Sequence, residues 1–278
     1  MSSSTTESYY IFSKNQPFPD PFPAGGLFLI DKPLAWTSFD VVKKVRSALV
    51  RKTGQKKLKV GHAGTLDPLA TGLLIVCVGQ YTRLIDTLQA MPKTYTGTVT
   101  FGATTPSFDL EKAVETTFPV DHLTDSLLQE KLPAFTGDIL QVPPIFSAVK
   151  VDGKRLYKNA RTGEEVELPH RPVHVESLEI GPLRKVVPER HEAVVAGDRG
   201  ARIMLHPDYA EGLQADFRVV CSKGTYIRSL AHDLGQAVDS GAYLSSLRRT
   251  GSGGFQVDDA WQVAELEAWM KGEVRGEM

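Results

Sequence analysis

Hydrophobic residues along this chain form short continuous runs and one clear alternating stretch. The runs Leu27–Ile30 and Leu73–Val78 are typical of strands that are buried on both faces. The pattern also predicts strands at residues 173–180 and 215–221. Alternation predicts a further strand at residues 94–101, with two different faces. One face carries Thr94, Thr96, Thr98 and Thr100, and the other carries Tyr95, Gly97, Val99 and Phe101.

Apolar residues spaced by three and four positions predict helices between these strands. Val41, Val45 and Leu49 lie on one stripe of a helix predicted from about 39 to 51, with Ser38 as its N-cap. Shorter helices are predicted at 82–90 and 123–135. Two further helices are predicted. One is capped by Thr225 and ends at Gly235, and the other is capped by Asp259 and ends at about Met270.

These elements alternate without a strict strand–helix–strand order. The predicted fold class is therefore α/β of the mixed α+β kind, with one mixed sheet. Residues 1–25 are rich in Ser and Pro and are predicted to form a flexible tail or a surface strap. Residues 26–256 are expected to form the main domain, with a polar insertion at 181–212. Residues 257–278 are expected to form a C-terminal helix.

Composition describes a globular protein rather than a membrane or disulfide-rich one. The chain has 278 residues, of which 41% are hydrophobic and 23% are charged. No apolar run approaches the roughly 20 residues that a membrane span needs. The N-terminus lacks the features of a secretory signal, and two cysteines are too few for a zinc site. A cytoplasmic location without membrane contact is expected.

The charges are unevenly distributed although the formal net charge is only −1. No acidic residue lies between Asp40 and Asp67. A near-neutral protein with such a local basic face can still bind a polyanion. Eight basic residues fill this interval: Lys43, Lys44, Arg46, Arg51, Lys52, Lys56, Lys57 and Lys59.

The segment Gly61–Gly72 places a single carboxylate in a loop rich in glycine. Pro68 fixes its own φ and disfavours the α region for Asp67, so the carboxylate is expected to point in one direction. On spacing alone, an ordinary Asp-Pro turn is an equally good interpretation.

The sequence Gly61-His62-Ala63-Gly64-Thr65-Leu66-Asp67-Pro68-Leu69-Ala70-Thr71-Gly72 meets every specified position of the motif G-H-x-G-T-L-D-P-x-A-T-G. This is the catalytic motif of the TruB family of tRNA pseudouridine synthases, which the chain resembles from about residue 26 to 256. Further matching segments are Gly26–Pro33, Lys93–Tyr95, Gln141–Lys150, Gly153–Tyr157 with Ala160-Arg161, Cys221–Leu230 and Leu247–Thr250. In the third, Phe146 replaces the usual Tyr.

The resemblance implies the pseudouridine synthase fold, in which a largely antiparallel mixed sheet is flanked by helices around one catalytic cleft. It implies an isomerase that flips uridine 55 out of the tRNA T loop and converts it to pseudouridine without metal or cofactor. Asp67 matches the catalytic carboxylate. Attack on the sugar, attack on the base and abstraction of a sugar proton all remain open as its role.

Other site residues follow from the same resemblance. Arg228 matches the arginine that pairs with the catalytic Asp, and Tyr95 matches the tyrosine that lies against the target base. His62 matches the histidine that packs into the T loop, and Tyr226 and Leu247 match residues that line the pocket. Phosphate contacts are expected from Lys32, Lys150 and Lys154, together with Arg155 and Arg161.

Each of these residues also has a simpler interpretation from the pattern alone. Arg228 fits a surface arginine on a first helical turn, Tyr95 and Leu247 fit core residues, and His62 fits a structural histidine. Each lysine singly fits a solvated surface charge.

Three alternatives at the level of function stay open. The chain could be a dyskerin-type synthase guided by a partner RNA, a tRNA-folding chaperone, or a hydrolase acting through Asp67 and His62. The residues Leu69-Ala70-Thr71 favour the stand-alone enzyme, for which the T stem-loop of tRNA is the partner and a monomer without an obligate protein partner is expected. A C-terminal PUA-type module is predicted to be truncated or absent.

Overall fold

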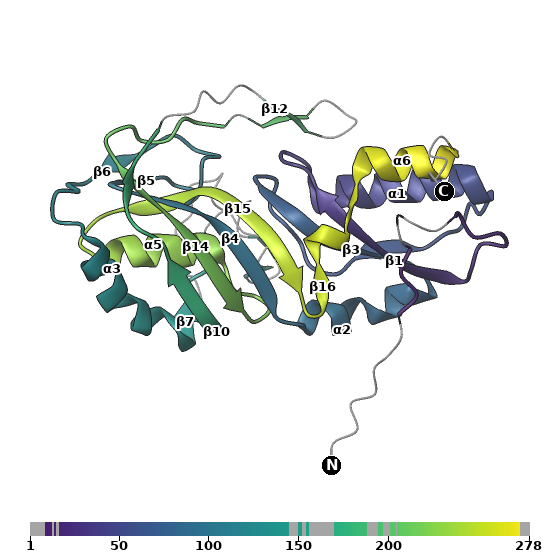
Figure 1. Ribbon diagram of the computed structural model, residues 1–278, viewed down its shortest axis with the longest axis horizontal. Coiled ribbons are helices and arrows are strands. Elements are labelled where there is room, and N and C mark those ends of the chain that lie inside the picture. Colours follow the sequence, from purple (N-terminus) through teal and green to yellow (C-terminus); the bar gives the residue numbers. More distant parts are fainter. Residues whose placement is uncertain are drawn as a thin grey trace, which may run out of the picture. The chain divides into compact units, whose positions relative to one another are not determined.

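The computed structural model describes residues 9–12, 14, 17–144, 150–151, 154–155, 170–187, 194–196, 201–203 and 205–272 (Figure 1). Contacts divide the chain into two compact units. The first contains Met1–Met91, Ala196–Gly200 and Arg249–Met278, and the second contains Pro92–Val195 and Ala201–Arg248. No helix in the described part of the chain is long and apolar enough to cross a membrane.

The first unit is built on two long antiparallel strands that come from the predicted apolar runs. Strand β1 (Gly25–Lys32) pairs with β3 (Ala70–Gly79) so that Leu27 faces Cys77 and Ile30 faces Leu74. Strand β2 (Val60–His62) pairs with β3, and the short β17 (Trp261–Gln262) runs parallel to β1. The predicted strands are confirmed, and the β1–β17 pair makes the sheet mixed.

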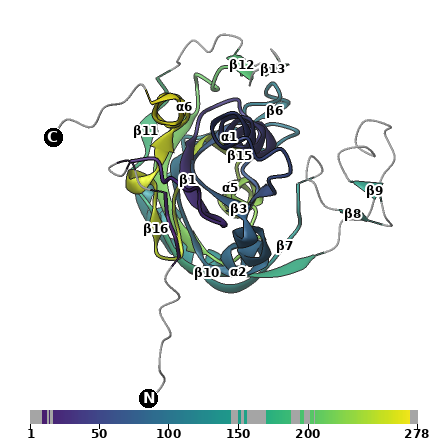
Figure 2. The same cartoon turned by 90° about the vertical axis from the view of Figure 1, so that its right-hand side faces the viewer.

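Side chains of β1 and β3 alternate between two separate cores. Phe28, Ile30 and Leu74 face helices α1 (Ser38–Thr53) and α6 (Val263–Lys271), which lie side by side. Leu29 and Ile75 face the opposite core, beneath the 3-10 turn η1 (Gln80–Leu84) and helix α2 (Ile85–Ala90). Burial on both faces explains why these strands are continuously apolar (Figure 2).

Part of the N-terminal segment packs onto this unit as a strap. Phe12 is only 3% exposed, and its ring stacks between Phe22 and Phe28 at centroid distances of 5.6 and 4.2 Å. The indole Nε1 of Trp261 donates to the Phe12 carbonyl at 2.9 Å. The Phe12 amide also donates to the Leu27 carbonyl at 2.9 Å, and the Leu27 amide donates to the Tyr10 carbonyl at 2.8 Å. The strap therefore joins β1 to the C-terminal part of the unit.

The second unit is an antiparallel sheet with helices on one face. Its strands run in the order β4 (Lys93–Phe101), β14 (Leu213–Cys221), β10 (Arg171–Ile180) and β7 (Gly137–Gln141). Its core packs beneath α5 (Ile227–Ala237), α3 (Asp125–Lys131) and the turn η2 (Leu132–Phe135). Short strands complete the described part: β5 (Ala103–Thr104), β6 (Thr116–Thr117), β8 (Lys150–Val151), β9 (Lys154–Arg155), β11 (Arg184–Lys185), β12 (Val194–Ala196) and β13 (Ala201–Ile203).

One long strand, β15 (Ala242–Ser252), was not predicted from the sequence. Its residues up to Arg248 belong to the second unit, and those from Arg249 belong to the first, where β16 (Phe255–Gln256) pairs with its end. Leu247 is the one apolar residue in the stretch Ser245–Arg249, so the sequence there shows no apolar alternation.

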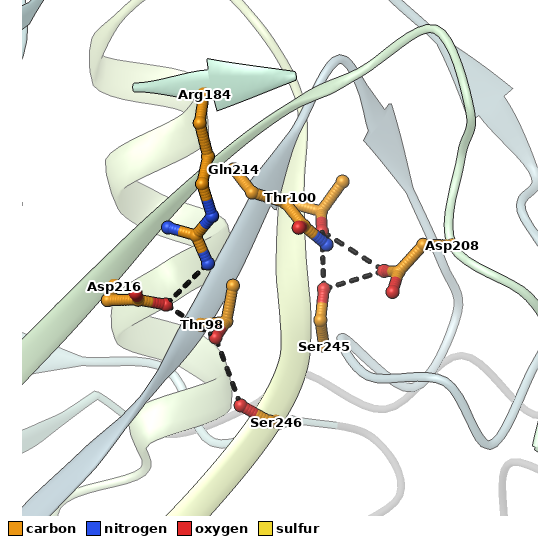
Figure 3. A network of polar contacts seen from close by, with 8 residues as sticks. All are labelled: Thr98, Thr100, Arg184, Asp208, Gln214, Asp216, Ser245 and Ser246. Atoms are coloured by element: carbon orange, nitrogen blue, oxygen red, sulfur yellow. Dashed lines mark hydrogen bonds and ion pairs between the residues drawn. The ribbon is translucent and has the colours of Figure 1, made fainter. Parts of the chain in front are cut away.

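The polar face of β4 carries a hydrogen-bond network that also fastens the described ends of the 181–212 region (Figure 3). Asp208 accepts hydrogen bonds from Ser245 at 2.7 Å and from Thr100 at 3.1 Å. Asp216 accepts from Thr98 at 2.8 Å and pairs with Arg184 at 2.7 Å. The predicted threonine face of β4 therefore forms side-chain hydrogen bonds with neighbouring segments.

The predicted helix caps were wrong by one to three residues, for local reasons. Helix α1 is capped by Thr37, whose side chain forms a capping box with Asp40, because Ser38 is turned inward. Helix α5 begins after Tyr226, since the Thr225 hydroxyl donates to the Ser222 carbonyl instead. The last helix, α6, is capped by Gln262 and Glu265, whereas Asp259 lies in the turn η3 (Val257–Asp259).

Candidate active site

The loop that carries Asp67 runs between β2 and β3, and the backbone requires glycine within the loop and near the start of β3. Gly72 has φ +100°, and a Cβ there would lie 2.2 Å from the Arg249 carbonyl oxygen. Gly64 has φ +106°. At both positions φ lies in the left-handed region that favours glycine, so backbone geometry explains why the motif has glycine there.

Arg249 fastens this loop from the inside. Its side chain is buried, with the residue 2% exposed. The Nε group donates to the Leu73 carbonyl at 2.6 Å, and Nη2 donates to the Gly64 carbonyl at 3.2 Å. The sequence identified Leu247–Thr250 as a matching motif but gave Arg249 no role. The available signal was the motif itself, which places two adjacent arginines, Arg248 and Arg249, in a mostly polar stretch.

Buried groups also hold the backbone on both sides of Asp67. The Ser38 hydroxyl accepts from the Leu66 amide at 2.9 Å and donates to the Leu66 carbonyl at 3.2 Å. The Pro68 carbonyl accepts from the Ala35 amide at 2.9 Å. Asp67 itself is partly exposed. The backbone on both sides of Asp67 is fixed while the residue itself is only half-buried, which suits a group that must meet a ligand.

Lys32 does not occupy the surface position expected of a phosphate contact. It is 0% exposed, and its Nζ donates to the carbonyls of Trp36, Pro33 and Pro68 at 2.6, 2.9 and 3.3 Å. Three carbonyl acceptors match the three N–H groups of an ammonium. Burial lowers the pKa of Lys32 to about 7, and the Asp67 carboxylate opposes that shift. Lys32 is therefore a buried cation beside Asp67.

His62 lies on β2 opposite Val76, at the entrance to the same loop. Burial lowers the pKa of its imidazole, and the Arg249 cation lowers that pKa further, partly opposed by the Gly64 backbone. The ring is therefore neutral near pH 7. A neutral, half-buried ring suits packing against a ligand better than carrying a permanent charge.

In the second unit, Arg228 is a buried residue rather than a surface arginine. It lies in the first turn of α5 and is 5% exposed. Its Nη1 donates to the Ser107 carbonyl at 3.1 Å, and its Nε lies 3.9 Å from Asp109 Oδ2. A guanidinium held by a carbonyl and a carboxylate has a defined direction.

The start of α5 is clamped by a glutamine from the Gln141–Lys150 motif. Gln141 is buried, and its side chain accepts from the Tyr226 amide at 2.9 Å and donates to the Tyr226 carbonyl at 3.2 Å. The Ser229 hydroxyl donates to the Val142 carbonyl at 2.7 Å. These bonds fix the backbone of Tyr226, and sequence reasoning had assigned Gln141 no individual role.

The remaining predicted residues are spread over the second unit. Tyr95 on β4 and Leu247 on β15 are half-buried and pack against the core of that unit. Lys150 and Lys154 lie on the paired strands β8 and β9, and their side chains are outside the described part, as is Arg161. Asp67, His62 and Lys32 belong to the first unit. The pairing of Asp67 with Arg228 stays a prediction.

The eight basic residues between 43 and 59 fall into two groups. Four make contacts within the protein: Lys43 pairs with Asp40, Lys44 pairs with Glu267, Arg46 donates to the Leu58 and Lys56 carbonyls, and Lys52 lies over the Phe18 ring. The other four are exposed, namely Arg51, Lys56, Lys57 and Lys59. The described contacts involve the charged groups of the first four residues but not those of the second four. The second four therefore present their charges to solvent.

In the part of the chain that the structure describes, neither the cysteines nor a cluster of metal-binding side chains forms a second site. Both cysteines are free and buried, and burial raises the pKa of Cys77 to about 12 and that of Cys221 to about 11. Among the described residues, no group of three or more His, Cys, Asp or Glu side chains is arranged to hold a metal ion.

Comparison with known families identifies the class of protein that this loop and sheet define. The model of the TruB family pseudouridylate synthase N-terminal domain matches residues 51–227. The model of the tRNA pseudouridylate synthase B C-terminal domain matches residues 228–277. The chain belongs to the TruB family, and the resemblance seen in the motifs is confirmed.

Individual relatives agree with this assignment. The chain is 46% identical over 250 residues to tRNA pseudouridine synthase B of Flavobacterium johnsoniae, covering 90% of this chain and 97% of that protein. It is 40% identical over 248 residues to tRNA pseudouridine synthase B of Corynebacterium aurimucosum, covering 89% and 74%. The fold is similar to that of the Cbf5-Nop10-Gar1 complex structure, with a TM-score of 0.58 and 25% identity. That match covers 97% of this chain but 64% of the other, and it confirms the predicted pseudouridine synthase fold.

The charges around Lys32 predict a ranked response of its pKa. Asp67→Asn should lower the pKa of Lys32 most, because Asp67 is the carboxylate that most favours the ammonium. Asp40→Asn should lower it less, and Asp31→Asn least. Titration of the ¹³Cε resonance of Lys32 by NMR measures each value. A pKa that is unchanged in Asp67→Asn would contradict the proximity of these two charges.

Proposed function

We propose that this chain converts uridine to pseudouridine at position 55, in the T loop of tRNA. The observation that carries the proposal is the Asp67 loop of a TruB family chain, in which Leu66 and Pro68 are fixed by hydrogen bonds to buried residues and Asp67 itself is half-buried. Relatives that share up to 46% identity are named tRNA pseudouridine synthase B, which supports the assignment.

The reaction needs a charge at Asp67 rather than a redox group. Pseudouridine formation breaks the bond between N1 of the base and the ribose, turns the base, and rejoins the ribose to C5, so it is an isomerisation. Asp67 acts as an ionised carboxylate in attack on the sugar, attack on the base or abstraction of a sugar proton, and these three routes remain open. The Asp67 charge in turn favours the ammonium form of the neighbouring Lys32.

The target base must leave its stack to reach a carboxylate. Tyr95 supplies an aromatic surface against the flipped base, and Tyr226 and Leu247 line its pocket in this proposal. Arg228 pairs with Asp67 and orients it. His62 fills the space that the base leaves in the T loop, which offsets part of the few kcal/mol that flipping costs.

The polyanionic partner is recognised by shape and by phosphate contacts. The exposed members of the basic block are Arg51, Lys56, Lys57 and Lys59. They contact tRNA phosphates in this proposal, together with Lys150 and Lys154. The chain acts on the T stem-loop as a monomer, without an obligate protein partner and without a cofactor.

A guide-dependent synthase is the closest alternative. The Cbf5 complex shares 25% identity with this chain, which spans 64% of that chain's length. The relative from Flavobacterium johnsoniae shares 46% identity over 97% of its own length. The second match is closer and more complete, and it favours an enzyme that acts without a guide.

One assay tests the proposed function directly. The purified chain is incubated with an unmodified tRNA transcript, and pseudouridine is mapped by carbodiimide treatment and primer extension. A stop at position 55 with no added RNA or protein is expected. No modification, or modification only with a guide RNA and partner proteins, would contradict the proposal.

Asp67→Asn should abolish isomerisation while keeping RNA affinity. The amide preserves the shape of the side chain but removes the charge, so the single-turnover rate should fall by at least about three orders of magnitude. The dissociation constant for tRNA should stay within about an order of magnitude. Asp86→Asn, the same change at an exposed site on α2, is the control. Substantial turnover by Asp67→Asn would remove Asp67 from the chemistry.

His62→Phe should retain far more activity than His62→Ala. Stacking against a nucleic-acid base contributes about 1–3 kcal/mol, so losing the ring should lower kcat/KM by about 10- to 100-fold. Burial lowers the pKa of His62 from its usual 6.5, so its ring is mainly neutral at pH 7 and above and should give no rate step between pH 7 and 8. Equal near-complete loss in both variants, with a pH step near neutrality in the wild type, would instead make His62 an acid or base.

Neutralising two exposed lysines should flatten the salt dependence of tRNA binding. Each lost phosphate contact reduces the slope of log affinity against log salt by just under about one unit, so Lys56→Gln with Lys59→Gln should reduce it by nearly two. The control is Lys43→Gln with Lys44→Gln, which removes two charges that already pair with carboxylates. Equal slopes for the test variant and the wild type would place the RNA on another surface.

A further inference from the structure

A short segment of the second unit grips helix α5 at two successive turns. The Ser107 carbonyl accepts from Arg228 Nη1 at 3.1 Å. The next residue, Phe108, stacks on His232 with ring centroids 3.9 Å apart and planes 11° from parallel. Arg228 and His232 are four residues apart, so they share one face of the helix. The segment therefore contacts both the arginine and the ring one turn beyond it.

The backbone of Phe108 is held in a conformation that its residue type disfavours. Its φ is +61°, in the left-handed region, which costs a non-glycine residue about 1–2 kcal/mol. Its amide donates to the Thr105 carbonyl at 3.1 Å, and its carbonyl accepts from the Leu244 amide at 3.0 Å. The strain persists because both backbone groups and the ring have partners.

His232 presents a neutral ring to this stack. Its Nδ1 is buried and has no hydrogen-bond partner among the described residues, and its Nε2 lies 3.1 Å from Gln236 Nε2. Burial lowers the pKa of His232, so the imidazole is uncharged near pH 7. The two rings meet face to face as uncharged surfaces, and the contact is one of packing.

We propose that the stack of Phe108 on His232 positions Arg228 for the pseudouridine reaction. Phe108 lies between the two groups that hold the guanidinium, the Ser107 carbonyl and the Asp109 carboxylate. If the ring is lost, the segment loses its contact with the second turn of α5, and the Ser107 carbonyl and the Asp109 carboxylate can then move relative to Arg228. The inference rests on the proposed function, because it concerns the arginine assigned to pair with Asp67.

Positioning differs from ordinary packing in what it changes. Neither ring is assigned a contact with RNA, so tRNA affinity should stay nearly constant when the stack is removed. Misplacement of a catalytic group by about 1 Å can cost about a hundredfold in rate. A positioning role thus predicts a fall in kcat with little change in binding, whereas lost stability alone predicts rates that follow the melting temperature.

Glycine at position 108 separates strain from stacking. Glycine adopts a left-handed φ without penalty, so the melting temperature of Phe108→Gly should be at least as high as that of Phe108→Ala. Both variants should nevertheless lose about 10- to 100-fold in the single-turnover rate on tRNA at saturating enzyme. Their dissociation constants for tRNA should stay within about threefold of the wild type.

Changes at the partner ring complete the test. His232→Ala should lose as much rate as Phe108→Gly, and His232→Phe should stay within about threefold of the wild type because it keeps a flat ring. The double variant Phe108→Gly with His232→Ala should be no slower than either single one, since both remove the same contact. Phe118→Ala removes a half-buried ring elsewhere in this unit and should leave the rate unchanged.

Two sets of results would overturn the inference. Wild-type rates in Phe108→Gly and His232→Ala would show that Arg228 needs no such support. Losses that multiply in the double variant, or that follow the melting temperature across the series, would show independent or purely structural effects. A wild-type chain that forms no pseudouridine in the same assay contradicts the proposed function instead, so the two failures are distinguishable.

Discussion

The buried guanidinium of Arg249 is the contact on which the loop around Asp67 depends. It donates to the carbonyl of Gly64, before Asp67 in the loop, and to that of Leu73, after Asp67 in β3. Removing it would leave two buried carbonyls without this donor, at about 1–3 kcal/mol each. Gly72 is required by the same contact, because any Cβ there would collide with the Arg249 backbone. The motif glycine and the arginine some 180 residues later thus form one structural unit.

Lys32 connects that geometry to the electrostatics of the site. A fully buried ammonium is unfavourable unless it is compensated, and here three carbonyls and the Asp67 carboxylate compensate it. One of those carbonyls belongs to Pro68, so Lys32 binds the backbone of the same loop whose carboxylate favours its charge. Asp67 therefore has a structural task as a counterion in addition to the chemical role proposed for it.

The sequence predicted the parts of this protein that depend on local pattern. Apolar runs gave β1 and β3, and the threonine alternation gave both faces of β4. Caps were misassigned where neighbouring residues compete, as Thr37 and Ser38 do. The motif resemblance nominated Asp67 and His62 as site residues, but no local signal shows that Lys32 donates to the Pro68 carbonyl or that Arg228 donates to the Ser107 carbonyl. Those contacts join residues 36 and 121 positions apart, so only the folded chain reveals them.

Left-handed backbone at non-glycine residues accompanies a held cation in each unit. Three such residues are described; Asp239 follows the end of α5, and the other two are Ala35 at φ +63° and Phe108 at φ +61°. Ala35 lies between the carbonyls of Pro33 and Trp36 that bind Lys32, and Phe108 follows the carbonyl that binds Arg228. Neighbouring carbonyls of a strand point in alternate directions and those of a helix point along its axis, so neither converges on one cation. Reversing φ at Ala35 allows the Pro33 and Trp36 carbonyls to converge on Lys32, and the bonds to the ammonium offset the strain. At Arg228 the Ser107 carbonyl acts together with the Asp109 side chain. Two of the three described left-handed positions therefore lie where an interior charge is held in place.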